Sequence, residues 1–322
     1  MPRQACPRLA GSWILLAGLL WAGANHRAAT GFSIAQGSTA KAEAVETALL
    51  PGQVLQDLEY ARVGPKSLRL DLYLPQRTSG ERLPAVIWIH GGAWLSGSKE
   101  NTRAFEVLGD GYAVASINYR LSFEGTFPAQ IHDCKAAVRW LRAHADQYGL
   151  DPERIGVWGS SAGGHLAALL GTTGDVVELE GTVGGDLDQS SRFQAVCDFF
   201  GPSDFLSVLE GAWSSVRSPT SPQALLLGGP VADRVELARL ASPVAHASPD
   251  DPPFLIVHGD RDLVAPLNQS VRLYQALRAA GVEVALHVVK GAGHGLRLQA
   301  FQDPAVDSLV RRFFDRHLRG LP

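Results

Sequence analysis

The sequence predicts an α/β fold, in which a doubly wound, mostly parallel sheet carries helices on both faces and a small cap segment. Three features of the 322-residue chain support this prediction. Continuous apolar runs bounded by turn residues suit strands that are buried on both faces. Segments with helical periodicity alternate with those runs, so neighbouring strands are expected to run parallel. One long stretch rich in Ser, Pro and Gly interrupts the alternation.

The expected elements follow from these patterns in chain order. Leu68, Leu70, Leu72 and Leu74 alternate with polar or aromatic neighbours, which predicts an antiparallel hairpin at the start. The apolar runs that predict strands lie at 85–89, 112–117, 155–158, 196–200 and 254–257, and 284–289 also has strand character. The segments that predict helices lie at 129–148, 162–170, 266–280 and 306–318. We therefore expect one catalytic domain over residues 54–322.

The interrupting stretch lies at residues 202–253 and has only short helical patterns, around Ala224 and Val235. In an open α/β sheet, a long excursion after a central strand tends to cover the crevice at the carboxyl ends of the strands. We interpret this stretch as a cap over the ligand site. A disordered loop is the weaker alternative because Trp213 and the three leucines at 225–227 need burial.

The first residues differ from the rest of the chain. Arg3 and Arg8 precede an uncharged apolar stretch from Trp13 to Ala24, so residues 1–24 are expected to form a secretory signal peptide. That stretch is shorter than the ~20 residues that span a bilayer, which disfavours a membrane anchor. Residues 25–53, rich in Ala, Ser, Thr and Gln, predict a mobile leader. We expect a protein exported to the periplasm or the extracellular space, without a stable membrane span.

Composition limits the classes of partner. Hydrophobic residues make up 46% and charged residues 19%, the balance of a packed globular protein. A formal net charge of -3 gives no electrostatic reason to expect nucleic acid. Cys134 and Cys197 are expected to be buried free thiols, although a bridge between them stays open. No spacing resembles a metal-ligand set or a phosphate loop, so neither a metal nor a cofactor is expected. The oligomeric state is left open.

Ser161 has the sequence context of a nucleophile. Residues 159–163 (Gly-Ser-Ser-Ala-Gly) follow the expected strand at 155–158 and open an apolar helix, as in a nucleophile elbow. Such a turn strains the serine backbone, while the flanking glycines leave room for close packing and the helix N-terminus favours a developing oxyanion. Ser160 falls outside the elbow register. The alternative is a structural Gly-Ser turn without chemistry.

A serine hydroxyl is a poor nucleophile near neutral pH, so it needs a base that accepts its proton. His294 lies in the glycine-rich loop 291–295, directly after the strand-like segment 284–289. A histidine in such a loop is seldom part of a core. We therefore expect His294 to be the base that acts on Ser161.

The base in turn needs an acid that orients it. Residues 258–262 (His-Gly-Asp-Arg-Asp) follow a predicted strand and contain two carboxylates. Asp262 is the expected acid, and Asp260 is expected to stabilise the turn by accepting backbone hydrogen bonds. Asp198 and Asp204 stay open as alternatives, because the chain order of a triad does not fix which strand supplies the acid.

Residues 90–94 (His-Gly-Gly-Ala-Trp) follow the predicted strand at 85–89 and suit an oxyanion hole. The backbone amides of Gly92, Ala93 and Ala162 are the expected donors, each typically worth about 2.7 to 4 kcal/mol in the transition state.

Other polar or aromatic residues near these motifs are expected to be structural. His90 should brace the oxyanion loop and Trp94 should pack rather than stack on substrate. His165, one helical turn beyond Ser161, and the pair His132 and Asp133 show no partner pattern in the sequence.

Taken in order, the motifs resemble those of bacterial esterases related to hormone-sensitive lipase and, more closely, the feruloyl-esterase-like branch of the α/β-hydrolases. The resemblance covers roughly residues 57–318 and rests on the segments 90–94, 119–121 (Tyr-Arg-Leu), 159–163, 258–262 and 293–295. It implies an eight-stranded sheet of the α/β-hydrolase type, carboxylic-ester hydrolysis without a cofactor, and catalytic roles for Ser161, Asp262 and His294. Many relatives of hormone-sensitive lipase have a third glycine where this chain has Ala93, which favours the Trp-containing branch.

The expected reaction is therefore acyl transfer through an acyl-enzyme, with short-chain or aromatic acyl esters as substrates. The substrate is expected to be a small molecule or to be linked to a polysaccharide, because export suits polymer-derived substrates. A serine peptidase or amidase of the same fold is the alternative. A non-catalytic binding protein is less favoured, since it has no need of all three residues.

Overall fold

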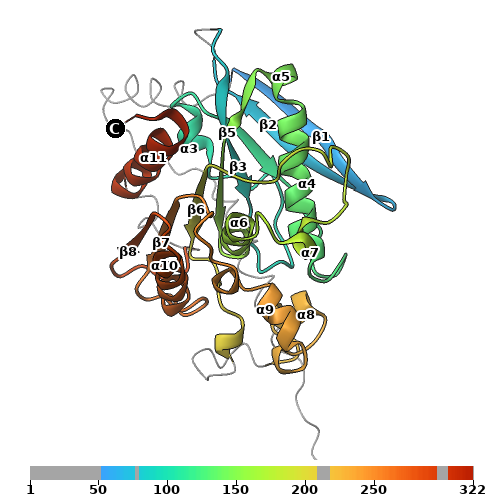
Figure 1. Ribbon diagram of the computed structural model, residues 1–322, viewed down its shortest axis with the longest axis vertical. Coiled ribbons are helices and arrows are strands. Elements are labelled where there is room, and N and C mark those ends of the chain that lie inside the picture. The colour runs from blue at the N-terminus through green and yellow to red at the C-terminus, as the bar shows by residue number, and fades with distance from the viewer. Residues whose placement is uncertain (1–51, 77–79, 209–217, 296–303, 322) are drawn as a thin grey trace, which may run out of the picture. The chain divides into compact units, whose positions relative to one another are not determined.

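The computed structural model describes residues 52–76, 80–208, 218–295 and 304–321. Within these ranges, eight strands form one sheet in the order β1-β2-β4-β3-β5-β6-β7-β8. The strands are β1 (Gln53–Val63), β2 (Lys66–Leu74), β3 (Leu83–Ile89), β4 (Ala113–Ile117), β5 (Leu150–Ser160), β6 (Ala195–Phe199), β7 (Phe254–Gly259) and β8 (Val284–Val289). Only the pairings of β2 with β1 and with β4 are antiparallel among these strands. The predicted eight-stranded, mostly parallel sheet is confirmed (Figure 1).

The first hairpin begins earlier than the sequence indicated. Gln53 pairs with Leu74, and the amide of Gly52 donates to the carbonyl of Leu74 at 2.8 Å. The last two residues of the leader predicted at 25–53, Gly52 and Gln53, thus pair with β2. The strand β1 lies at the edge of the sheet, and its mostly exposed side chains give no apolar alternation. The rest of that leader and the predicted signal peptide at 1–24 lie outside the described residues.

Helices cover both faces of the sheet, as a doubly wound fold requires. Alternate residues of β3 show the two layers: Ile87 packs in the core with α4, α6 and α10, and Trp88 packs in the core with α3 and α11. These helices are α3 (Phe105–Leu108), α4 (Ala129–Ala143), α6 (Ala162–Thr172), α10 (Asn268–Ala280) and α11 (Pro304–Arg319). The helix expected at 129–148 is interrupted at His144, where α4 ends and α5 (Ala145–Tyr148) follows.

The excursion at 202–253 contains short helices in its described part: η1 (Leu206–Val208), α8 (Pro222–Leu227), η3 (Val231–Asp233), α9 (Val235–Leu240) and η4 (Pro243–Ala245). Helices α8 and α9 lie side by side beyond α6 (Figure 1). Leu226 and Leu227 are buried as expected, but Leu225 is 41% exposed. Three consecutive helical residues spread over about 200°, so they cannot all face one core. Trp213 lies outside the described residues.

Cys134 and Cys197 are free and buried, so the bridge between them that the sequence left open is not formed. Cys134 on α4 belongs to one apolar core and Cys197 on β6 to the other. Their thiols therefore lie on opposite faces of the sheet.

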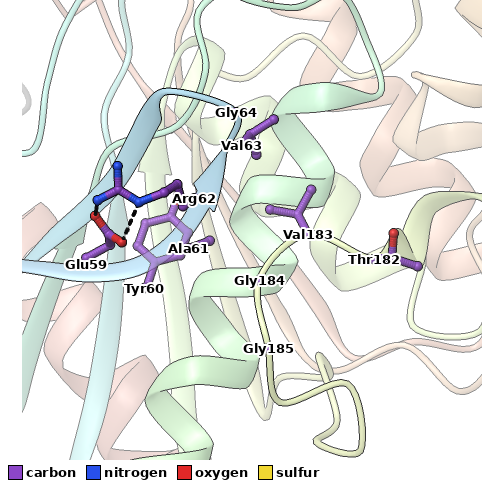
Figure 2. Close-up of a pocket in the computed structure, with 10 residues that line it drawn as sticks. All are labelled: Glu59, Tyr60, Ala61, Arg62, Val63, Gly64, Thr182, Val183, Gly184 and Gly185. Carbon is purple, nitrogen blue, oxygen red and sulfur yellow. Dashed lines mark hydrogen bonds and ion pairs between the residues drawn. The ribbon is translucent and has the colours of Figure 1, made fainter.

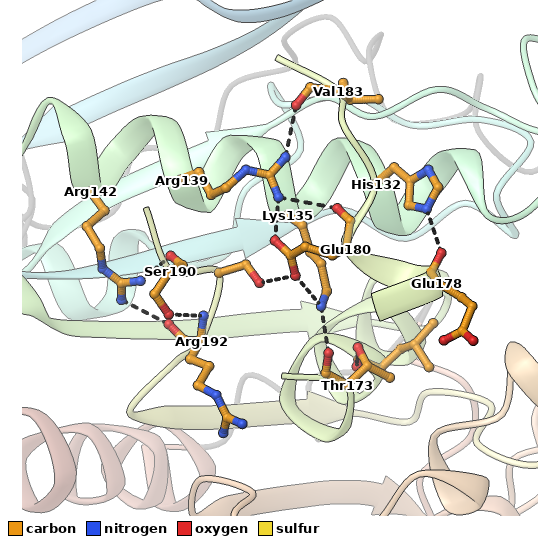
Figure 3. Close-up of polar contacts among 12 residues, drawn as sticks. His132, Lys135, Arg139, Arg142, Thr173, Glu178, Glu180, Val183, Ser190 and Arg192 are labelled. Atoms are coloured by element: carbon orange, nitrogen blue, oxygen red, sulfur yellow. Dashed lines mark hydrogen bonds and ion pairs between the residues drawn. The ribbon is translucent and has the colours of Figure 1, made fainter. Parts of the chain in front are cut away.

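The segment between α6 and β6 is fastened to α4 by buried ions (Figure 3). Lys135 donates to Glu180 at 2.9 Å and to the carbonyl of Thr173 at 2.6 Å, and its side chain is fully buried. Arg139 binds the other carboxylate oxygen of Glu180 and the carbonyl of Val183. Glu180, on α7 (Val177–Glu180), thus compensates two cations that the core has removed from water.

Candidate active site

The candidate site lies where the parallel strands of the sheet have their carboxyl ends. Strands β3, β5, β7 and β8 run parallel, so the segments that follow them emerge at the same edge. These segments are the ones that carry the sequence motifs. The fold therefore brings together loops that are far apart in the chain, as expected for the ligand crevice of an open α/β sheet.

Ser161 occupies a strained turn between β5 and α6. Its φ of 55° and ψ of -120° are rare for a residue with a side chain, and its amide donates to the carbonyl of Phe199 at 2.8 Å. Close backbone contacts impose the turn: a Cβ on Gly159 would lie 2.2 Å from the carbonyl oxygen of Gly163, and a Cβ on Gly163 would lie 2.0 Å from that of Ile89. Glycine is thus required at both positions, as a nucleophile elbow predicts.

The side chains of Ser161, His294 and Asp262 form one hydrogen-bonded chain. Asp262 accepts a hydrogen bond from His294 Nδ1–H at 2.6 Å, so the opposite nitrogen, Nε2, is the acceptor for the Ser161 hydroxyl at 2.8 Å. The Asp262 side chain is fully buried and that of His294 is 7% exposed. The structure therefore holds the imidazole in the tautomer that can take a proton from serine.

Asp262 is held as a carboxylate. Its Oδ1 accepts the amides of Val264 and Ala265 at 2.8 and 2.9 Å, while Oδ2 faces both His294 and His258, the latter at 3.2 Å. Burial raises the pKa of Asp262, but the hydrogen bonds from His258 and His294 outweigh it and hold the pKa below its ordinary value.

His258 is a residue to which sequence reasoning assigned no role. Its side chain is fully buried, its Nε2–H donates to the carbonyl of Ala265 at 2.8 Å, and its Nδ1 accepts from the Ser270 hydroxyl at 2.7 Å. These bonds place Nε2 of the ring 3.2 Å from the carboxylate oxygen of Asp262 that also faces His294. A histidine near the end of a strand, four residues before the expected acid, was the available signal.

The other carboxylates face different partners. Asp198 accepts the amide of Gly201 at 2.9 Å, and Asp204 forms an ion pair with Arg272 at 2.9 Å and accepts nearby amides. Asp260 accepts the amide of Gly291 at 2.6 Å, which ties its turn to the loop of His294 rather than to itself. Of the alternatives that the sequence left open, only Asp262 reaches the imidazole within the described residues.

The expected oxyanion loop lies against Ser161. A Cβ on Gly91 would lie 2.9 Å from the carbonyl oxygen of Ser160 and 3.3 Å from Ser161 Cβ. Gly92 has a φ of 111°, and the carbonyl of Gly92 accepts the amides of Leu95 and Ser96 at 2.9 and 3.0 Å. Within the described ranges, the amides of Gly92 and Ala93 donate no hydrogen bond to the protein. Both donors are therefore available to a ligand.

Two aromatic side chains of this loop, His90 and Trp94, pack against the rest of the protein. His90 is buried, donates from Nδ1 to the carbonyl of Gly91 at 2.7 Å and stacks on Tyr119 with 4.4 Å between ring centroids. Burial lowers the pKa of His90 to about 4, so the ring is neutral near pH 7. Trp94 is 1% exposed and packs edge-on to Phe205, which agrees with a packing role.

His165, His132 and Asp133, for which the sequence showed no partner pattern, each have a polar partner in the structure. His165 accepts from the Trp94 indole and donates to the carbonyl of Ala241. Asp133 forms a bidentate ion pair with Arg120, and His132 Nε2 contacts the carbonyl of Glu178 at 3.2 Å. The partners come from distant segments, so no local spacing could indicate them.

A separate cavity lies away from Ser161, Asp262 and His294. It has a volume of about 600 Å³ and lies between β1 and the loop 182–185, where an ion pair of Glu59 and Arg62 borders it (Figure 2). Because β1 is an edge strand and β5 is central, this cavity is remote from Ser161.

The described part of the chain holds no group of three or more His, Cys, Asp or Glu side chains that could bind a metal ion. None of its helices combines the length and apolar character needed to cross a bilayer.

A serine, a histidine and an aspartate in one relay at the carboxyl edge of such a sheet define an α/β-hydrolase. The chain belongs, within that class, to the BD-FAE family, whose model matches residues 70–277.

Individual relatives are esterases by name. The chain is 32% identical to Esterase LipC of Mycobacterium tuberculosis over 240 residues, which are 71% of this chain and 57% of that protein. It is also 32% identical to the probable carboxylic ester hydrolase LipM of the same organism over 227 residues, 69% of this chain and 51% of that protein. The chain thus matches a little over half the length of these curated relatives.

Solved structures give the same fold. A truncated form of a carbohydrate esterase from gut microbiota has a TM-score of 0.74 at 34% identity, covering 84% of this chain and 97% of that one. A bifunctional GH43-CE protein of Bacteroides eggerthii has a TM-score of 0.75 at 35% identity, covering 82% of this chain and 35% of that one.

Proposed function

We propose that the chain is a serine carboxylic-ester hydrolase that works through an acyl-enzyme. The observation that carries the proposal is the relay from the Ser161 hydroxyl through His294 to the buried carboxylate of Asp262. The names of the relatives, esterases and carboxylic ester hydrolases, support the same reaction class.

In the first half of the reaction, Ser161 Oγ attacks the ester carbonyl carbon as His294 Nε2 takes the hydroxyl proton. The resulting oxyanion accepts hydrogen bonds from the amides of Gly92, Ala93 and Ala162. The bond to the alkoxy oxygen then breaks, and His294 returns its proton to the leaving alcohol. The acyl group remains on Ser161.

In the second half, water attacks the acyl carbon while His294 takes a proton from it, and the acid leaves as Ser161 regains its proton. Asp262 is not protonated in either half. It stabilises the imidazolium and keeps Nδ1 as the donor, and His258 helps to hold the same carboxylate oxygen in place.

The proposed substrates are esters of short-chain or aromatic acids, as small molecules or attached to polysaccharide. The gut carbohydrate esterase among the structural relatives supports the polysaccharide-linked class. The same proposal includes export, on the strength of the apolar N-terminal stretch with its preceding arginines.

The test is turnover of a substrate panel by the purified chain and by Ser161→Ala. The panel holds p-nitrophenyl esters of increasing chain length, a feruloyl ester, acetylated xylan and a peptide p-nitroanilide. We expect hydrolysis of at least one ester, and a loss of about 10³-fold or more in Ser161→Ala with the fold intact. An enzyme that cleaved only the anilide, or a Ser161→Ala variant that kept its esterase activity, would contradict the proposal.

A further inference from the structure

His165 connects three segments around the candidate site: helix α6, the oxyanion loop and the excursion. It lies fully buried on α6, one turn after Ser161, and its backbone amide donates to the carbonyl of Ser161 at 2.9 Å. The indole Nε1–H of Trp94, in the oxyanion loop, donates to His165 Nδ1 at 3.2 Å. The His165 Nε2–H donates to the carbonyl of Ala241, in the excursion, at 2.7 Å.

The environment fixes which nitrogen of His165 carries the hydrogen. Burial lowers the pKa of His165 to about 4, so the ring is neutral near pH 7 and has one donor and one acceptor. A carbonyl can only accept, so Ala241 requires the hydrogen on Nε2 and leaves Nδ1 to accept from Trp94. Phe205 stacks on the ring at 5.0 Å between centroids, which further restricts its rotation.

The oxyanion loop needs such an anchor because its backbone is strained. Ala93 and Trp94 have φ angles of 57° and 59°, in the left-handed region that side chains disfavour. Such strain persists only where the surroundings hold it. The Trp94 carbonyl accepts the amide and the hydroxyl of Ser122 at 2.8 and 3.1 Å. The indole bond to His165 holds the other end of the same residue.

We propose that His165 is a positioning residue for the oxyanion hole: its Nδ1 holds Trp94, and through Trp94 the amides of Gly92 and Ala93, in line with Ser161. This inference rests on the proposed function. The bond to Ala241 has a separate effect, because it sets the tautomer of the ring and attaches the excursion to α6.

Two near-isosteric substitutions separate the two bonds. In His165→Asn the carboxamide oxygen lies near the position of Nδ1 and can accept from the indole, while the donor to Ala241 is lost. In His165→Gln the carboxamide reaches the position of Nε2 and can donate to Ala241, while the acceptor for Trp94 is lost. Trp94→Phe removes the indole N–H from the opposite side of the same bond.

The main readout is the rate at which a fluorophosphonate probe labels Ser161, measured by intact-protein mass. The phosphonyl oxygen gains negative charge in that step, so the rate reports on the oxyanion hole without needing a known ester. We expect His165→Gln and Trp94→Phe each to slow labelling and kcat by about tenfold or more, with KM within about twofold of wild type. Complete loss of one oxyanion donor costs about 10²- to 10³-fold.

We further expect the double variant of His165→Gln and Trp94→Phe to be labelled no more slowly than either single variant. His165→Asn should keep most of the wild-type labelling rate, although its excursion is less tightly attached to α6. His246→Gln is the matched control, because His246 donates a similar bond to the carbonyl of Leu240 at 2.9 Å without contacting the oxyanion loop. Its labelling rate should equal that of wild type.

The outcomes separate this inference from the proposed function. Equal slowing in His165→Asn and His165→Gln, in proportion to lost folding stability in urea, would mean a structural role and overturn the inference. Normal labelling of His165→Gln would overturn it as well, with the proposed function untouched. A wild-type protein that the probe did not label would overturn both.

Discussion

Replacing Asp262 by asparagine tests the relay with the smallest change in volume. The carboxylate is surrounded by donors only: the amides of Val264 and Ala265 on Oδ1, and ring N–H groups of His258 and His294 on Oδ2. An amide has one acceptor oxygen and an NH₂ group that must itself donate. With its oxygen on the two backbone amides, the substituted side chain would point its NH₂ at two imidazole donors.

One of the two imidazoles must then change tautomer. His258 cannot do so without losing its bond to the carbonyl of Ala265, so we expect His294 to change. Its Nδ1 then accepts from the new amide, and its Nε2 carries a hydrogen and can no longer take the proton of Ser161. In a serine-protease triad the same substitution lowers kcat by about 10⁴-fold, and we expect a fall of about 10³- to 10⁴-fold here.

The assay is kcat/KM on the best p-nitrophenyl ester, with ¹⁵N chemical shifts of the His294 ring as a direct report of the tautomer. Asp204→Asn is the matched control, since Asp204 pairs with Arg272 and does not contact His294. It should keep kcat/KM within about threefold. A folded Asp262→Asn variant with more than about a tenth of wild-type activity, or an Asp204→Asn variant equally inactive, would refute the reasoning.

Two further predictions concern folding stability. Burial raises the pKa of Asp198 from 3.8 to about 6, although the bond from the amide of Gly201 lowers it, so between these pH values the folded state binds more protons than the unfolded state. The free energy of unfolding contributed by Asp198 therefore falls as pH rises from about 4 to about 6, by roughly 3 kcal/mol in all. Asp198→Asn should lack this fall. In urea unfolding, its free energy of unfolding relative to that of wild type should therefore rise by that amount between about pH 4 and pH 7. If the free energies of the two proteins changed in parallel with pH, Asp198 would be ionised in the folded state. Glu180→Gln should lower the free energy of unfolding by about 2 kcal/mol near neutral pH, because it leaves Lys135 and Arg139 buried without their carboxylate. The value is below that for a fully buried pair because the Glu180 side chain is 37% exposed, and Asp188→Asn, at a surface carboxylate, should change stability by less than about 0.5 kcal/mol.

The regular elements could be predicted from the sequence because their signals are local. The apolar runs at 85–89 and 155–158 lie within β3 and β5, and the helical segment at 162–170 lies within α6. Strands buried on both faces and helices with an apolar face repeat their burial every few residues, and that repetition is visible in one chain. The alternation of these elements then determined the parallel sheet.

The misses occur where the deciding contact is long-range. The bond between Trp94 and His165 spans 71 residues, and that between His165 and Ala241 spans 76. β1 gave no pattern because an edge strand has few buried side chains. Pairings of this kind depend on how elements are packed in three dimensions, so sequence spacing carries no record of them.

The strained residues show why the site itself could nevertheless be recognised. Ser161, Ala93 and Trp94 all have positive φ angles, a choice that local preferences oppose at each position. Sequences that fold well agree with local preferences nearly everywhere, so departures concentrate where function requires a particular geometry. Glycines must surround such departures to admit the close backbone contacts, as Gly91, Gly159 and Gly163 do here. The strained backbone can therefore be recognised in the sequence from the glycine-rich motifs around it. The buried ring of His165, which we propose to hold the strained loop, has no such motif.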